Sequence, residues 1–152
     1  MKRVFYSSIA LILIFLMPSC RSNYPLTSIN YLSGTEQTVS VRVVGVGATQ
    51  ESAIINAEHK VFDVLFFRGL PESNQKTAMV GTDETAEKMK NKKYFDNFYD
   101  GNRHRSFILS STPVSGLIKV KGGNSITVDV KINLSALRND LEAFGVIRKF
   151  GF

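Results

Sequence analysis

The fold is decided by residues 38–68, which read TVSVRVVGVGATQESAIINAEHKVFDVLFFR. The first ten of these residues alternate apolar and polar side chains, and this period of two predicts a β-strand over Thr38–Gly47. At Val43 and Val44 the alternation shifts by one residue, and Gly45 follows. The shift predicts a β-bulge or a sharp twist at this point of the strand.

Residues 50–68 predict a long helix. Thr49 suits the N-cap because its hydroxyl can accept a backbone N–H, and Gly69 and Pro71 suit the helix end. Apolar residues recur at helical spacing along one side, so this helix is predicted to form the core of the domain. They are Ala53, Ile54, Ala57, Val61, Val64 and Leu65, and Phe62, Phe66 and Phe67 widen the apolar side.

The glycines at 45 and 47 do not predict a nucleotide site. Gln50 stands where the third glycine of a dinucleotide fingerprint belongs, and no Gly-Lys-Ser/Thr follows. The pair predicts a tight turn from strand to helix instead. His59 has no second histidine or cysteine at ligand spacing, so neither a metal nor any other cofactor is predicted.

Three strands and a helix are predicted in the last third of the chain. The strands are Ser106–Thr112, Val114–Lys121 and Ser125–Asn133, arranged as a meander, with a hairpin turn at residues 122–124. Ser135 is predicted to cap a helix that runs to Phe144, with Leu134, Leu137, Leu141 and Phe144 as its buried stripe. The predicted fold class is therefore α+β, in the order β-α-β-β-β-α. About four antiparallel strands carry the long helix and the C-terminal helix on one face.

The middle and the end of the chain contain the candidate interaction residues. Residues 83–91 fit either a short exposed helix or a mobile loop, and residues 94–99 (YFDNFY) predict an aromatic turn of helix on the core. Arg103, His104 and Arg105 form the densest basic segment, a candidate for binding an acidic partner or lipid phosphate; the alternative is a solvated start of a strand. The tail with Phe150 and Phe152 either packs on the domain or docks on a partner.

The first twenty residues have the pattern of a secretion signal. Lys2 and Arg3 precede nine uninterrupted apolar residues, 9–17, which are too few for the roughly 20 that span a bilayer. Pro18, Ser19 and Cys20 follow, and Cys20 is the only cysteine of the chain. This ending resembles a bacterial lipobox, in which a small residue precedes an acylated cysteine. It implies a signal peptide over 1–19, a lipidated Cys20 with a tether over 20–37, and a single domain over 38–152.

The alternative reading of the N-terminus is an ordinary signal with an unmodified cysteine, or a buried helix. If Lys2 and Arg3 are removed, 17 basic side chains face 13 acidic ones, and the net charge falls from +6 to +4. The signs alternate along the chain, so nucleic acid is not a predicted partner. The predicted location is the bacterial cell envelope, with the lipid anchor in the outer membrane and the domain facing the periplasm.

The order of elements, the Gly-ending strand at 43–48, the Ala-containing helix at 53–65 and the hairpin at 114–132 resemble small envelope lipoproteins grouped with the flagellar-assembly-T N-terminal domain. That resemblance implies a binding or assembly module of an envelope complex. A second resemblance is to accessory lipoproteins of contractile, type VI-like secretion systems.

Two functions other than an assembly subunit are compatible with a small domain of this kind: an enzyme, and a periplasmic ligand-binding or inhibitor module. His59 and His104 lie on separate predicted elements, and Asp96, Asp100 and Asp129 are scattered, so no catalytic site is predicted. A deep apolar pocket between helix and sheet would favour the ligand-binding module. A filled core with exposed aromatic residues would favour the assembly subunit.

Overall fold

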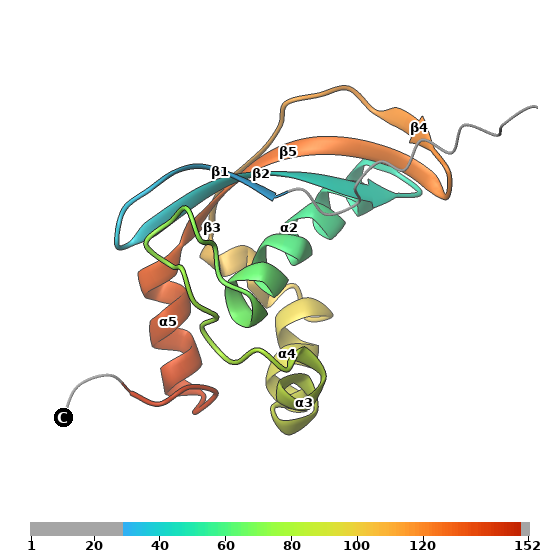
Figure 1. The fold of residues 1–152 in the computed structure, drawn as a ribbon. Helices are drawn as coiled ribbons and strands as arrows, with labels where there is room; N and C mark the ends of the chain where they lie inside the picture. The colour runs from blue at the N-terminus through green and yellow to red at the C-terminus, as the bar shows by residue number, and fades with distance from the viewer. Residues whose placement is uncertain (1–28, 150–152) are drawn as a thin grey trace, which may run out of the picture.

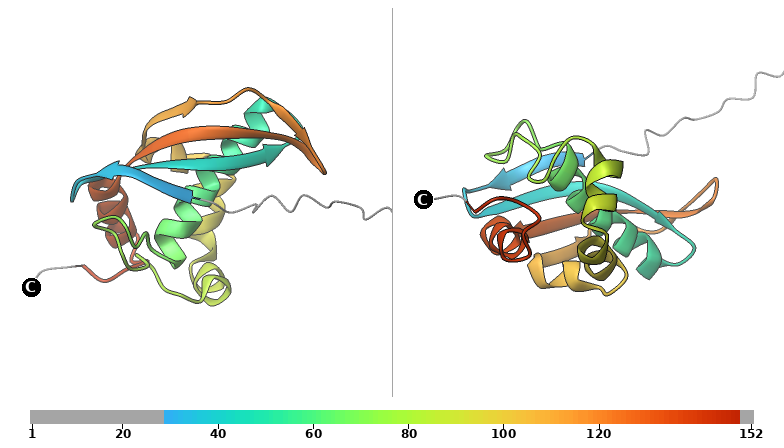
Figure 2. Two further views of the ribbon diagram at one scale, coloured as in Figure 1. Left: turned by 45° about the horizontal axis from the view of Figure 1, so that its top comes forward. Right: turned by 90° about the horizontal axis from the view of Figure 1, so that it is seen from below.

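The computed structural model describes residues 29–149. Within that range an open antiparallel sheet of five strands packs against four α-helices, which confirms the predicted α+β class. Figure 1 shows the sheet as the upper layer and the helices as the lower one, and Figure 2 shows the same two layers from other sides. Cys20, Phe150 and Phe152 lie outside the described residues.

The elements are assigned to the following residues. The strands are β1 (Ile29–Gly34), β2 (Thr38–Gly47), β3 (Ile108–Pro113), β4 (Ile118–Val120) and β5 (Gly123–Asn133). The helices are α2 (Gln50–Phe67), α3 (Glu84–Lys90), α4 (Lys92–Tyr99) and α5 (Leu134–Ala143), with a 3₁₀ helix, η2 (Arg103–Phe107), before β3. In the sheet the order is β1-β2-β5-β3, and β4 pairs with β5.

The first strand was not predicted. β1 pairs antiparallel with β2, from Ile29 opposite Val43 to Gly34 opposite Val39, so residues 29–34 of the predicted tether belong to the sheet. Its sequence, INYLSG, is short and half polar, and the strand reading is supported only by its pairing with a valine-rich neighbour. The domain therefore begins nearer to Cys20 than the sequence predicted.

The predicted bulge in β2 is wrong. Every residue from Thr38 to Gly47 has a partner on β5 in unbroken register, and the irregularity lies in β1, between Tyr31 and Ser33. The apparent shift in the pattern arises because Gly45 occupies the inward position. A Cβ there would lie 1.9 Å from the Ala53 carbonyl oxygen, and one at Gly47 would lie 2.3 Å from the Ser52 hydroxyl. The glycines let α2 cross close to the strand.

The caps of α2 are confirmed and extended. The Thr49 hydroxyl accepts the backbone N–H of Ser52, and the Ser52 hydroxyl accepts the backbone N–H of Thr49. The two hydrogen bonds form a capping box. Gly69 has φ 79°, as a C′ residue requires. The N–H groups of Met79 and Val80 donate to the carbonyls of Leu65 and Phe66, each at 3.0 Å, so the polar segment after the helix is fixed on its last turn.

The C-terminal third departs from the meander. β3 pairs with residues 128–132 of β5 and β4 with residues 123–125, so both lie along the same edge of one long strand. The predicted strand over 114–121 is reduced to Ile118–Val120, because the Ser115 hydroxyl replaces a backbone partner and accepts the Thr127 N–H at 2.9 Å. In this way β3 and β4 form one interrupted edge strand.

Two details of the closing helix differ from expectation. Asn133, the last residue of β5, is the N-cap in place of Ser135, since its side chain accepts the Ala136 N–H at 2.9 Å. Leu134, Leu137 and Leu141 are buried as predicted, whereas Phe144 is 55% exposed. Phe144 lies one position past the end of α5, where the chain turns through Gly145 with φ 70°.

The core lies between α2 and the inner face of the sheet. Phe62, Phe66 and Phe98 are fully buried, and the ring of Phe98 lies 5.0 Å from that of Phe62 and 5.1 Å from that of Phe66. The aromatic segment over 94–99 is α4, with three buried aromatic residues, as the sequence predicted. The helices therefore share one aromatic core beneath the sheet.

Candidate functional sites

A buried polar cluster lies where α2, η2 and β3 meet. His104 is fully buried and Glu58 is 5% exposed, and the Glu58 Oε2 and His104 Nε2 atoms are 3.5 Å apart without a hydrogen bond. His59 packs edge-on against His104, with the ring centroids 4.5 Å apart. The structure thus brings together two histidines that sequence spacing treated as unrelated. The adjacency of Glu58 and His59 was the only local signal of this cluster.

The electrostatics of the cluster follow from its burial. His104 Nδ1 lies 3.2 Å from the Phe98 carbonyl oxygen, which can only accept, so Nδ1 carries a proton and Nε2 faces Glu58. Burial alone would raise the pKa of Glu58, but His104, Ser111 and the charge of Arg105 reverse the effect and the pKa is lowered. Burial lowers the pKa of His59, and the nearby His104 lowers it further by a smaller amount.

The cluster resembles a set of catalytic groups but is closed. A Ser, a His and a Glu meet there, yet the Ser111 hydroxyl is buried beside Glu58 and inaccessible. A reaction needs space for a substrate beside the nucleophile and the base. The two surface hollows described below are lined by other residues. The arrangement fits a packed polar contact between α2 and β3.

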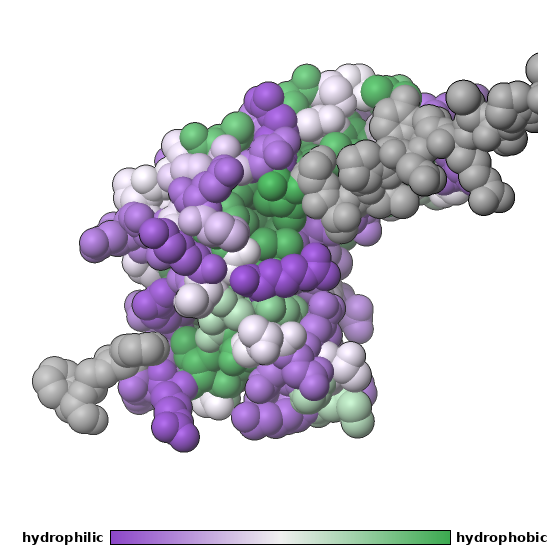
Figure 3. Space-filling model, in the orientation of Figure 1, coloured by the Kyte–Doolittle hydropathy of each residue, from purple (hydrophilic) through white to green (hydrophobic). Residues whose placement is uncertain are grey.

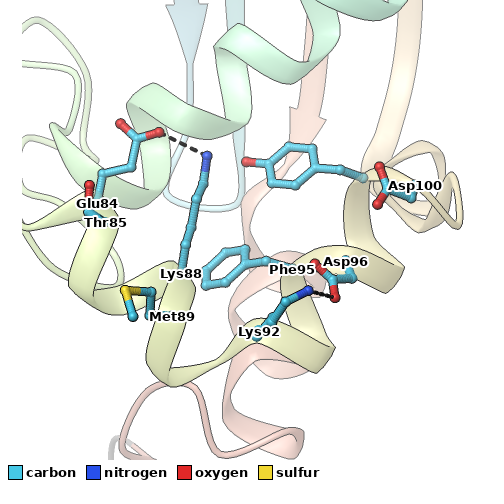
Figure 4. A pocket seen from close by; sticks show the side chains of 9 residues that line it. Glu84, Thr85, Lys88, Met89, Lys92, Phe95, Asp96 and Asp100 are labelled. Carbon is cyan, nitrogen blue, oxygen red and sulfur yellow. Dashed lines mark hydrogen bonds and ion pairs between the residues drawn. The ribbon is translucent and has the colours of Figure 1, made fainter.

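The first surface hollow, of about 440 Å³, lies between α3 and α4. Figure 4 shows Lys88 reaching across it to Glu84, with the Phe95 ring beside it. The Lys88 ammonium donates to Glu84 at 2.8 Å and to Asp63 at 3.0 Å, and lies 5.1 Å from the centre of the Tyr99 ring. Lys88 therefore connects α3 to α2 at the base of the hollow.

Charges at this hollow are paired. Burial lowers the pKa of Lys88, but its hydrogen bonds to Glu84 and Asp63 outweigh burial and the pKa is raised. Burial and the facing Asp63 raise the pKa of Tyr99, whose hydroxyl donates to Asp63 at 2.7 Å. Met89, at the rim of the hollow, is 74% exposed. The hollow therefore combines satisfied charges with one exposed apolar side chain.

The predicted basic segment does not act as one patch. The Arg103 guanidinium donates to the Asp140 carboxylate and lies 4.4 Å from the centre of the Phe144 ring, whereas His104 is buried and Arg105 is exposed. Tyr94 also donates to Asp140, at 2.9 Å. The sequence grouped the three residues because it could not show that the 3₁₀ turn of η2 points them in different directions.

A second hollow, of about 390 Å³, lies beside this contact and is lined by Tyr94 and Phe144. Its basic side chains come from Lys90, Lys92 and Lys93. Together with Met89 at the rim of the first hollow, these residues place exposed apolar and basic groups in one region of the molecule. We call this region, around Met89 and Phe144, the helical end.

The outer face of the sheet has no helix on it among the described elements. Side chains directly opposite one another in antiparallel strands share a face, so the register defines its rows. Arg42 and Asp129 form a bidentate ion pair in one row, at 2.7 and 2.8 Å. Figure 3 shows separate hydrophobic groups among hydrophilic and neutral ones on the upper rim, where the segment from β3 to β4 runs in Figure 1.

Three further findings concern the chain as a whole. Comparisons with protein-family models, with curated proteins and with solved structures found no match. Within residues 29–149, no helix has both the length and the apolarity to cross a bilayer. In the same range, no three His, Cys, Asp or Glu side chains are grouped so that they could hold a metal ion.

Proposed function

We propose that this chain is a bacterial lipoprotein, anchored in the cell envelope through an acylated Cys20, whose domain is a non-enzymatic subunit of an envelope assembly. The proposed location in the envelope is supported by the first twenty residues, which have a basic start, a short apolar run and a single cysteine. Two or more acyl chains hold a protein stably on a membrane, whereas one does so marginally. In this proposal the anchor lies in the outer membrane and the domain faces the periplasm.

The observation that supports a binding subunit is the exposure of apolar side chains at the sheet end and at the helical end of the domain. Ile118 is 59% exposed at the sheet end, and Met89 and Phe144 are 74% and 55% exposed at the helical end. Glu58 and His104, the acid and base closest to a catalytic arrangement, are buried. Exposed apolar groups of this kind are characteristic of contact surfaces.

Lipidation is tested by growing cells with a labelled fatty acid. The native chain is expected to carry the label, the Cys20→Ala variant to lose both label and membrane association, and Ser19→Ala, which keeps a small residue before the cysteine, to retain both. An unlabelled native chain would refute the anchor.

The assembly role is tested by cross-linking in cells and purification of the acylated chain. A stoichiometric envelope protein is expected, and Met89→Asp combined with Phe144→Asp should lower its yield, whereas Asn139→Asp, at an exposed position of α5, should not. Recovery of the chain alone would contradict the assembly role. The identity of the partner separates a general envelope complex from a contractile secretion system.

A ligand-binding or inhibitor module is the second candidate, because the hollow beside Lys88 has a volume in the range of small-molecule sites. Its central charge, Lys88, is already paired with Asp63 and Glu84. Co-purification of a stoichiometric small molecule, with no protein partner, would favour this candidate.

A further inference from the structure

One end of the outer face of the sheet has apolar side chains on both sides of Ser125 and Thr127. Val46, Ser125 and Ile118 form one row across β2, β5 and β4, and Val44 lies opposite Thr127 in the next. Val114 donates its N–H to the Thr127 carbonyl at 2.9 Å, which continues that row. Ile118 is 59% exposed, Val114 45% and Leu117 43%. We call Val44, Val46, Val114, Leu117 and Ile118 the apolar end of the outer face.

The fold itself does not require these apolar side chains. The inner face of the same strands already forms the core, with Val43 and Val128 at 1% and 0% exposure. At the other end of the outer face, the same alternation places polar partners opposite one another, Arg42 with Asp129 and Ser40 with Lys131. A sheet face that is merely solvated is polar throughout. Exposed apolar side chains gathered at one end of a face are typical of a contact surface.

The first described strand begins beside this patch. Ile29, the first residue of β1, lies opposite Val43, one residue before Val44. Eight residues lie between Cys20 and Ile29, so the nine steps of the covalent chain reach at most about 30 Å. The apolar end extends over the next three strands, within about 20 Å of Ile29, given the spacing of strands and of residues along them. An anchor at Cys20 would therefore keep the start of β1 within about 30 Å of the bilayer, a distance over which the apolar end can reach the membrane.

The edge of β2 beyond Ile29 is closed by side chains of α2. The Val46 N–H donates to Asn56 Oδ1 at 3.0 Å, and Lys60 Nζ donates to the Val44 carbonyl at 2.9 Å. These groups would otherwise pair with an added strand. Since they are occupied, a partner cannot add a strand at this stretch of β2. The outer face is the surface left for contact at this end of β2.

The charges at this end suit an anionic surface. Lys119 lies in β4 and Lys121 in the turn to β5, and both are exposed at this edge of the sheet; the alternation along β4 turns Lys119 to the face opposite Ile118. Of the acidic side chains nearby, Asp129 is paired with Arg42, and Glu51 lies in the first turn of α2. Lysines beside exposed apolar groups are the usual composition of a surface that rests on anionic headgroups.

We infer that the apolar end of the outer face rests on the same bilayer that holds Cys20, so that the helical end points away from the membrane toward its protein partner. This inference rests on the proposed function. The bilayer is the one occupant that the short connection from Cys20, the position of Ile29 and the two lysines all favour. A second copy of the chain, or a protein, is the alternative that the experiment separates.

The test uses the absence of tryptophan from the chain. The mature chain from Cys20, which holds every described element, is coupled through its single thiol to a maleimide lipid. It is then placed on vesicles of phosphatidylcholine and phosphatidylglycerol that contain brominated lipid. Ile118→Trp reports on the apolar end, and Met89→Trp, at an exposed apolar residue of the helical end, is the matched control. Circular dichroism and thermal unfolding check that both variants fold.

The inference predicts that brominated lipid quenches the tryptophan of Ile118→Trp by roughly half and that of Met89→Trp very little, because quenching requires contact with the acyl chains. Adding Val114→Asp to the Ile118→Trp chain should remove most of the quenching. Reversing both lysines, Lys119→Glu with Lys121→Glu, should weaken it on these vesicles but not on vesicles of phosphatidylcholine alone.

Equal quenching of the two tryptophans, or none of either, overturns the inference. A blue-shifted emission from Ile118→Trp that bromine does not quench, and that disappears when the chain is diluted over more vesicles, also overturns it and assigns the face to a second copy. Because the anchor here is chemical, these outcomes are independent of whether cells acylate Cys20. Failure of the docking surface is thus distinguishable from failure of the proposed lipoprotein.

Discussion

The two faces of the same strands differ sharply. On the inner face, Val41, Val43 and Gly45 of β2 are buried beneath α2. On the outer face, Ser40 and Arg42 give way to Val44 and Val46, which are half-buried with no helix above them in the described domain. The inner face shows what the chain buries by itself. The valines of the outer face are not part of the core, so we assign them to contact with the bilayer.

The largest effect is expected where the helix touches the inner face. Gly45→Ala places a Cβ against the backbone of Ala53, so the free energy of unfolding should fall by about 3 kcal/mol. Gly116→Ala is the matched control, because nothing lies within 4 Å of a Cβ there. Its unfolding free energy in urea should change by less than about 0.5 kcal/mol. Equal effects at the two glycines would contradict the described packing.

Neighbouring valines on opposite faces give the next effect. Val43→Ala removes a buried side chain and should lower the free energy of unfolding by about 2 kcal/mol, whereas Val44→Ala should cost under about 0.5 kcal/mol. Urea unfolding of the domain without its lipid measures both. A large loss for Val44→Ala would show that the outer valine is part of the core.

The buried cluster predicts a smaller, pH-dependent effect. The pKa of His59 is lowered from its ordinary 6.5, so as the pH falls below about 6.5 the unfolded chain takes up a proton that the folded chain does not. Stability should fall over this window, and His59→Gln should reduce the slope. The lowered pKa of Glu58 adds a loss that begins only at more acidic pH, below its ordinary 4.5. A stability that does not change between pH 7 and 5.5 would contradict the burial of His59.

The smallest effect is expected at the ion pair of the outer face. Arg42 lowers the pKa of Asp129, yet both side chains are partly exposed, so solvent screens the pair. Asp129→Asn should change the unfolding midpoint only slightly at low salt, and the difference should disappear at high salt. A large loss that persists in salt would mean that the pair is shielded by a neighbouring element.

Local chemistry explains which features could be predicted from the sequence. The cap at Thr49, the turn at Gly69 and the alternation in β5 are set by nearby residues, and the structure confirms them. β1 was missed because its strand character comes from pairing with β2. The apparent bulge was an inward-facing glycine, whose reason lies on α2.

The candidate sites depended still more on long-range contacts. His59 and His104 meet only after η2 folds onto α2, and Arg103 is separated from Arg105 by its contact with Asp140. Phe144 is exposed because α5 ends one residue before it, at Ala143. None of these contacts leaves a periodic signal in the sequence.

The central claim is that the domain is held at a membrane through Cys20. Intact-mass spectrometry of the native protein, extracted from membranes with detergent, tests it most directly. The account predicts a chain that begins at Cys20 and carries the added mass of acyl groups on that residue. A chain that begins elsewhere, or one that begins at Cys20 with no added mass, would contradict it.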